Sequence, residues 1–220
     1  NYNGILYPTV YDKWKTRVSL GQDAGTPQNF DIQNNIIYKG KASIVNGYYS
    51  FSFIVPKDID YNYGKGKLSH YAQNDNSNQY GWDTTFVVGG VDPNGIVDNE
   101  GPEIDLFMND ESFVNGGLTN SRPTFIAHVR DENGVNTTGN GIGHNITLVI
   151  DGNSAEAIIL NNFYESDLDT YQSGKARYPL SDLEPGLHTA TFKVWDVNNN
   201  SSENTLEFNV VEEQEIVISH

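Results

Sequence analysis

Apolar and polar residues alternate with a period of two along most of the chain. Short alternating runs are bounded by Gly, Asn, Asp or Pro, and the 3.6-residue period of an amphipathic helix is almost missing. Successive side chains of a strand point to opposite faces, so this pattern predicts an all-β chain of antiparallel sheets. The clearest apolar positions are Tyr49, Phe51, Phe53 and Val55; Phe125, Ala127 and Val129; Ile146, Leu148 and Ile150; Ala190, Phe192 and Val194; and Leu206, Phe208 and Val210.

Turn-forming and acidic residues gather between positions 89 and 102, and a new alternating run begins at Glu103. We therefore predict two tandem antiparallel β-sandwich domains, residues 1–96 and 97–215, with 216–220 opening a linker to a downstream domain. The second has the length of a seven-stranded immunoglobulin-like sandwich. The first is more irregular, with strands expected at 5–10, 15–20, 30–44, 48–55, 67–73 and 84–89, and it could lack an opening strand before Asn1.

The charge balance narrows the classes of partner. The chain has 29 acidic and 13 basic residues, giving a formal net charge of −16. Such a surface repels nucleic acid and anionic membranes, and it suits an exported protein or one that gathers divalent cations. No apolar run approaches the roughly 20 residues that a membrane helix needs. We expect neither nucleic-acid binding nor membrane insertion.

Cysteine is absent from the 220 residues, which excludes a disulfide framework, a thiolate metal site and a cysteine nucleophile. No GxSxG motif and no HExxH or HxH spacing is present, so neither a serine nucleophile nor a zinc site is indicated. The chain opens on Asn1 without an initiator Met or a signal peptide. We expect a non-catalytic segment of a longer secreted polypeptide.

Several stretches, in order, carry a family resemblance: GILYPTVYDK (4–13), FIVPKDI (53–59), YGKGKLS (63–69) with Tyr71 after it, GPEIDLFMND (101–110), GNGIGH (139–144), and LHT (187–189) running into KVWD (193–196). Together they resemble the C-terminal region of PorU-like sortases of the type IX secretion system, which are gingipain-type cysteine peptidases. In that family a peptidase domain precedes such modules and a sorting domain follows them.

The resemblance implies a parent protein that attaches secreted cargo to the surface of a Gram-negative bacterium, in association with the outer membrane. The catalytic His and Cys of the family lie upstream of this region, so no catalytic residue is carried over. What it implies for this chain is a spacer and docking module. Its expected partners are the peptidase and sorting domains of the same parent and secretion-system proteins at the cell surface.

A cation site is the sharpest chemical candidate. In an immunoglobulin-like sandwich the B–C and F–G loops share one end with the entering linker. Calcium prefers six to eight hard oxygen ligands. The alternative is that these Asp and Asn residues form turns through their own backbone. The candidate ligands are Asp98 and Glu100 in the linker; Asp131, with Glu132 and Asn133, in the B–C loop; and Asp196, Asn198 and Asn200 in the F–G loop.

Two other stretches resemble ligand-binding motifs only in part. Residues 58–62 (DIDYN) place oxygens as an EF-hand loop does, but Tyr63 stands where Gly is required and Ser69 where Glu is required. The glycines of 139–143 lack both the GxGxxG spacing and a preceding βα unit, so loop glycines are the preferred interpretation. We expect no nucleotide site.

The first domain also has aromatic residues in a loop-rich region: Tyr61, Tyr63, Tyr71, Tyr80 and Trp82. Such rings could stack on sugars, which gives the alternative function of a glycan- or adhesin-type binding module. The two functions make different predictions. A binding module requires an exposed aromatic strip, whereas a spacer would pack these rings into edges or between the domains. The short, acidic, Pro-containing linker favours rigidity between the domains.

Overall fold

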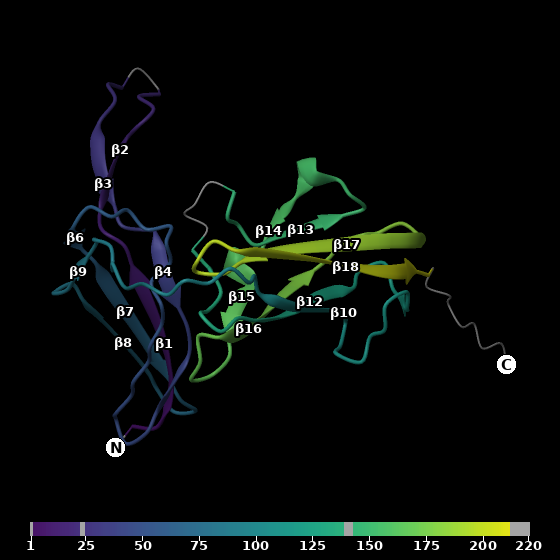
Figure 1. Cartoon of the computed structure of the whole chain (residues 1–220), viewed down its shortest axis with the longest axis horizontal. Helices are drawn as coiled ribbons and strands as arrows, with labels where there is room; N and C mark the ends of the chain where they lie inside the picture. The colour runs from purple at the N-terminus through teal and green to yellow at the C-terminus, as the bar shows by residue number, and fades with distance from the viewer. Residues whose placement is uncertain (1, 23–24, 139–142, 212–220) are drawn as a thin grey trace.

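The computed structural model describes residues 2–22, 25–138 and 143–211. We call residues up to 96 the first half and residues from 97 the second half. Figure 1 shows the sheet of the first half standing beside the two layered sheets of the second. The regular secondary structure of the described chain is almost wholly β-strand, in mostly antiparallel sheets, which confirms the predicted all-β sandwich class. Among these residues, no helix is long and apolar enough to cross a membrane.

The first half is organised around one five-stranded sheet in the order β4-β1-β7-β8, with β5 also pairing β1. Its strands are β1 (Gly4–Tyr11), β4 (Ile36–Lys39), β5 (Ala42–Ile44), β7 (Lys67–Gln73) and β8 (Asn78–Asp83). Two small sheets join β2 (Lys15–Val18) to β3 (Asn29–Ile32) and β6 (Gly64–Lys65) to β9 (Val87–Val88). The β2–β3 hairpin projects from the body (Figure 1).

The alternating apolar residues of β1 and β7 bury one face of the first sheet. Leu6 and Val10 on β1 and Ala72 on β7 are buried, so one face of the sheet meets the core. Residues 49–55 cover that face without forming a strand, contrary to the strand expected at 48–55. Phe51 and Phe53 of this segment stack on Tyr38, which explains their alternation. The alternation at 49–55 therefore reflects the packing of an extended segment on the sheet, not hydrogen-bonded pairing with another strand.

The second half is a two-sheet sandwich. One sheet has the order β10-β12-β16-β15 and the other β11-β18-β17-β13-β14. The first order, and β18-β17-β13 of the second, fit the ABED and GFC orders expected of an immunoglobulin-like sandwich, with β11 and β14 added at the edges. The strands are β10 (Glu103–Met108), β11 (Leu118–Thr119), β12 (Thr124–Arg130), β13 (Thr147–Ile150), β14 (Ile158–Ile159), β15 (Tyr164–Ser166), β16 (Ser173–Pro179), β17 (Gly186–Trp195) and β18 (Ser201–Val210). Two short 3₁₀ helices, η1 (Ser154–Glu156) and η2 (Asn161–Phe163), flank β14.

The main core lies between these two sheets. Phe125 of β12, Phe192 of β17 and Phe208 of β18 are fully buried there, and each belongs to a run whose alternation predicted it. Burying a Phe side chain stabilises a fold by roughly 1.5–3 kcal/mol. The 89–102 connection carries no strand. The domain limits at 96/97 and 215/216 stay predictions, and residues 216–220 lie outside the described part of the chain.

Candidate functional site

Three carboxylates from separate parts of the second half converge at one end of the sandwich. Asp98 lies in the 89–102 connection, Asp131 follows β12 directly and Asp196 follows β17 directly. One carboxylate oxygen from each lies within 4.8 Å of the other two. Because β12 and β17 end at the same side of the sandwich, their following loops meet the connection there. This is the arrangement expected from the immunoglobulin-like loop order.

Turn hydrogen bonds hold two of these carboxylates. Oδ1 of Asp131 accepts the backbone N–H groups of Asn133 and Gly134, both at 2.8 Å. Oδ1 of Asp98 accepts the backbone N–H of Glu100 at 3.0 Å, and its Oδ2 accepts the side-chain amide of Asn133 at 2.7 Å. The turn interpretation therefore accounts for one oxygen of Asp131 and one of Asp98, whereas Oδ2 of Asp98 is bonded across to the loop after β12.

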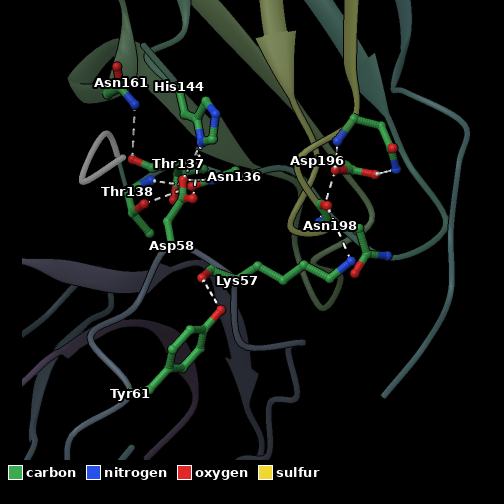
Figure 2. Close-up of polar contacts among 11 residues, drawn as sticks. Lys57, Asp58, Tyr61, Asn136, Thr137, Thr138, His144, Asn161, Asp196 and Asn198 are labelled. Atoms are coloured by element: carbon green, nitrogen blue, oxygen red, sulfur yellow. Dashed lines mark hydrogen bonds and ion pairs between the residues drawn. The ribbon is translucent and has the colours of Figure 1, made fainter. Parts of the chain in front are cut away.

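The third carboxylate is bound within its own loop. Oδ1 of Asp196 accepts backbone N–H groups of Asn198 and Asn200 at 2.9 and 2.7 Å, and Oδ2 accepts the Asn200 side-chain amide at 2.7 Å. Figure 2 shows Asp196 and Asn198 on this loop above Lys57 of the first half. Asn198 through its backbone N–H, and Asn200 through its backbone and side-chain N–H groups, thus position the Asp196 carboxylate.

The electrostatics of the cluster favour a positive charge. Burial, with the charges of Asp196 and Asp98 adding to it, raises the pKa of Asp131 to about 6. Burial also raises the pKa of Asp196. The pKa of Asp98 is lowered, first by the hydrogen bond from the Glu100 amide and then by that from Asn133. Charged carboxylates this close repel one another unless a cation or a proton intervenes.

Glu100 stands apart from the three converging carboxylates. It is exposed and lines an adjoining groove of about 550 Å³, together with Asp98, Glu103, Asp131 and Glu132. Of the six candidate ligands, the structure thus brings together the carboxylates of Asp98, Asp131 and Asp196. Oxygen donors of this kind fit calcium, so the site stays a prediction for that ion.

A second polar cluster lies at the seam, the set of contacts between the two halves. Asp58 comes from the first half, and its side chain is only 7% exposed. Its Oδ2 accepts the side-chain amide of Asn136 at 2.8 Å and lies 2.8 Å from Nδ1 of His144, both in the second half (Figure 2). The His144 ring packs against Trp195, with centroids 4.2 Å apart. A carboxylate buried in this way needs donors, and the partner half supplies them.

Further contacts extend the seam along the edge of the first sheet. Lys41 pairs with Glu165 at 2.6 Å and forms a parallel β-bridge with Leu168. The Asp169 carboxylate accepts hydrogen bonds from the backbone N–H of Ser43 at 2.6 Å and its hydroxyl at 2.7 Å. Backbone groups are thus bonded across the seam as well as side chains.

A third set of contacts comes from the 57–61 segment. The Lys57 backbone N–H donates to the Val197 carbonyl at 2.9 Å, and its Nζ reaches the Asn198 carbonyl at 3.3 Å. Lys57 thus ties the seam to the loop that carries Asp196. In this segment the Asp60 carboxylate accepts hydrogen bonds from the backbone and side-chain N–H groups of Asn62. The Asp58 carboxylate instead bonds to the second half, so the oxygens of the EF-hand-like motif do not converge. Residues 139–142 lie outside the described residues.

The five aromatic candidates separate into two groups. Tyr71, Tyr80 and Trp82 lie on the outward face of the β1-β7-β8 sheet and are 41%, 85% and 73% exposed. Tyr61 instead donates its hydroxyl to the Lys57 carbonyl at 2.8 Å, at the seam. Tyr63 lines an apolar groove with Phe86 and Val88. The sequence interpretation did not include Tyr7, which pairs with Tyr71 across the sheet.

One solved structure is similar to this chain in fold. It is described as dimeric latent PorU from Porphyromonas gingivalis, and it is similar to this chain over 97% of the chain with 34% identity and a TM-score of 0.52. The chain is related to a region of PorU. It spans 20% of that PorU chain, so this PorU-related region corresponds to a minor part of the solved protein. No protein-family model and no curated protein matches the chain.

Proposed function

We propose that the chain is the non-catalytic β-sandwich region of a PorU-like sortase of the type IX secretion system. In this role it holds an upstream peptidase domain at a fixed distance from a downstream sorting domain. It also offers docking surface to secretion-system proteins. The similarity to PorU supports the parentage, and the absence of cysteine from the chain is consistent with a peptidase nucleophile located elsewhere.

The seam is the observation that carries this proposal. A flexible tether would leave the halves without specific contacts. Here a buried carboxylate, ion pairs, backbone hydrogen bonds and a β-bridge join them, as given for Asp58, Lys41, Ser43 and Lys57. A spacer that transmits position needs such contacts, because a hinge would average the distance between its ends. The expected location, at the surface of the cell that exports it, follows from the same parentage.

Small-angle X-ray scattering of the chain tests the rigidity. The scattering curve of the unaltered chain should fit one rigid arrangement of the two halves. A variant carrying Lys41→Ala, Asp58→Ala and Asp169→Ala loses the seam contacts of these three side chains and should show a larger radius of gyration, with both halves still folded. If the unaltered chain already scatters as two independent bodies, the spacer role is wrong.

We propose in addition that calcium occupies the Asp98, Asp131 and Asp196 cluster. The supporting observation is the raised pKa of Asp131, which reflects a carboxylate held in a half-buried site beside two others. A divalent ion would remove that repulsion and fix the 89–102 connection to the loops after β12 and β17. Because Lys57 bonds to the loop after β17, the ion would stiffen the seam as well.

A further inference from the structure

The outward face of the first sheet is unusual for a solvated β-surface. Antiparallel sheets with one buried face normally present polar side chains to water on the other. Here β1, β7 and β8 place Tyr7, Tyr71 and Tyr80 in register on three adjacent strands. Trp82 lies in the next row, opposite Ser69. Large exposed aromatics gathered on one face are the kind of patch that marks binding.

Contacts with neighbouring side chains hold the Tyr7 and Tyr71 rings in place. The centroids of Tyr7 and Tyr71 lie 5.9 Å apart with their planes at 42°. The Gln73 side-chain amide donates to the Tyr7 hydroxyl at 3.1 Å, which orients that ring. At the other corner, Lys67 Nζ lies 4.1 Å from the centroid of the Tyr11 ring. The spacing of neighbouring strands thus sets a ladder of rings, with a separation close to the length of one sugar residue.

The row runs into a groove at its Tyr7 end. This groove has a volume of about 540 Å³, within the range of ligand pockets. Ile5 and Tyr7 of the first half form one side, and Phe163, Lys175 and Arg177 of the second half form the other. The lysines in it are matched by acids: Lys41 pairs with Glu165, and Lys175 pairs with Glu111 at 2.7 Å.

We propose that this face binds a linear, uncharged oligosaccharide, whose rings stack along Tyr7, Tyr71 and Tyr80 and beside Trp82, with one end in the groove. The chemistry of the face suits a sugar ligand. Tyr and Trp are common in protein interfaces too, but here Tyr7, Tyr71 and Tyr80 form one row across three strands, and such a row offers successive rings for stacking. Amides and hydroxyls that can bond sugar hydroxyls surround the rings. They belong to Thr9, Ser69, Gln73 and Asn78.

Charge supports the same class of ligand. The outward positions of β1, β7 and β8 carry no carboxylate, although the chain has 29 acidic residues. The nearby lysines are engaged with Tyr11, Glu165 and Glu111. Lys67 is the one charged side chain at these outward positions, so the face carries little charge in a strongly acidic protein, which suits an uncharged ligand. The exposure of Tyr80 and Trp82 is what the binding-module alternative requires. A rigid spacer can also carry such a face, so this inference stands apart from the spacer role.

The test is isothermal titration of the purified chain with cellohexaose, laminarihexaose and mannohexaose. We expect at least one to bind the unaltered chain, and Tyr80→Ala and Trp82→Ala each to weaken that binding about tenfold. Both side chains are largely exposed, so circular dichroism and the melting temperature should stay unchanged. Tyr80→Phe keeps the ring and should retain binding. Tyr63→Ala removes a tyrosine that is 77% exposed but not on this face, and it should bind as the unaltered chain does.

Several outcomes would overturn the proposal. One is failure of all three hexasaccharides to bind the folded chain. Another is binding that survives both Tyr80→Ala and Trp82→Ala. Salt-sensitive binding of hexagalacturonate alone would show that the ligand is acidic rather than uncharged. A dimer of the unaltered chain in sedimentation, dissociated by Tyr80→Ala, would instead identify the face as a protein interface.

Discussion

At the scale of single residues, both ring nitrogens of His188 face hydrogen-bond acceptors. Nδ1 lies 2.7 Å from an Asp151 carboxylate oxygen and Nε2 lies 2.7 Å from the Glu184 carbonyl. Only the doubly protonated ring can donate to both. Burial lowers the pKa of His188, but the hydrogen bond to Glu184 and the hydrogen bond and charge of Asp151 outweigh it, so the pKa is raised above 6.5.

This raised pKa predicts a pH dependence of stability. The folded state binds the proton of His188 more tightly than the unfolded state. The stabilisation is therefore fully present below the unfolded pKa of 6.5 and is lost as the pH rises through the folded pKa. Urea unfolding of the chain and of His188→Gln should differ most near about pH 6 and least near about pH 8. A difference that grows with pH would contradict the protonated ring.

Calcium binding makes a residue-scale prediction at Asp131. If the ion binds only the folded state, a hundredfold excess over its dissociation constant adds about 2.7 kcal/mol to the free energy of unfolding. The melting temperature in calcium should therefore exceed that in EDTA. Asp131→Asn should abolish the rise while keeping an acceptor for the Asn133 and Gly134 amides. Glu132→Gln, an equal charge change at an exposed neighbour, should keep it. Equal responses in both variants would exclude Asp131 as a ligand.

The sequence predicted these three carboxylates because loop order in an immunoglobulin-like sandwich is regular. It did not predict the pairing of Asp58 with His144, which are 86 positions apart and in different halves. Nothing in local alternation or turn chemistry connects them. Their contact depends on how two separate bodies dock, which a pattern within either one does not encode.

At the scale of elements, β15 and β16 pack closely at a glycine. Gly174 of β16 pairs with Ser166 and lies against the buried Tyr164. A methyl group there would overlap the Tyr164 hydroxyl and the Glu165 carbonyl oxygen, which strand pairing holds in place. Gly174→Ala should therefore destabilise the fold by about 1–3 kcal/mol, measured by urea unfolding.

The matched control for this change is Gly81→Ala on β8. An added Cβ at Gly81 meets nothing within 4 Å, and the residue lies in an extended strand. Removing a glycine from a strand reduces the entropy of the unfolded chain, so this variant should be neutral or slightly more stable. A similar loss in both variants would show that strand glycines, rather than the Tyr164 contact, decide the effect.

The elements also show where alternation misleads. Tyr49, Phe51, Phe53 and Val55 alternate like a strand but pack as an unpaired extended segment. The opposite error is β8, which was not expected. Its sequence NQYGWD is poor in β-branched residues and includes Gly81, and its apolar members Tyr80 and Trp82 face solvent. Strand pairing with β7, rather than burial, maintains it.

At the scale of the whole molecule, the seam should contribute to global stability. Removing the Asp58 carboxylate leaves the Asn136 and His144 donors without their acceptor. Asp58→Ala should therefore cost about 1–3 kcal/mol in denaturant unfolding and increase proteolysis between the halves. Asp60→Ala, two positions away, removes a carboxylate bonded only to Asn62 among the described residues, and should stay within about 0.5 kcal/mol. Equal losses of unfolding free energy in the two variants would show that the Asp58 contacts across the seam do not stabilise the molecule.

The seam also has a consequence for how the molecule is assembled. Its side-chain contacts between the two halves join residues 78 to 141 positions apart. Contacts so distant in sequence form late, after the local strand pairs within each half. As the chain is synthesised from its N-terminus, the first half must wait with its Lys41 edge and Asp58 unpaired until the second half has folded. Joining of the halves should then be a separate, slower kinetic phase, and the exposed edge during that interval is where aggregation would begin.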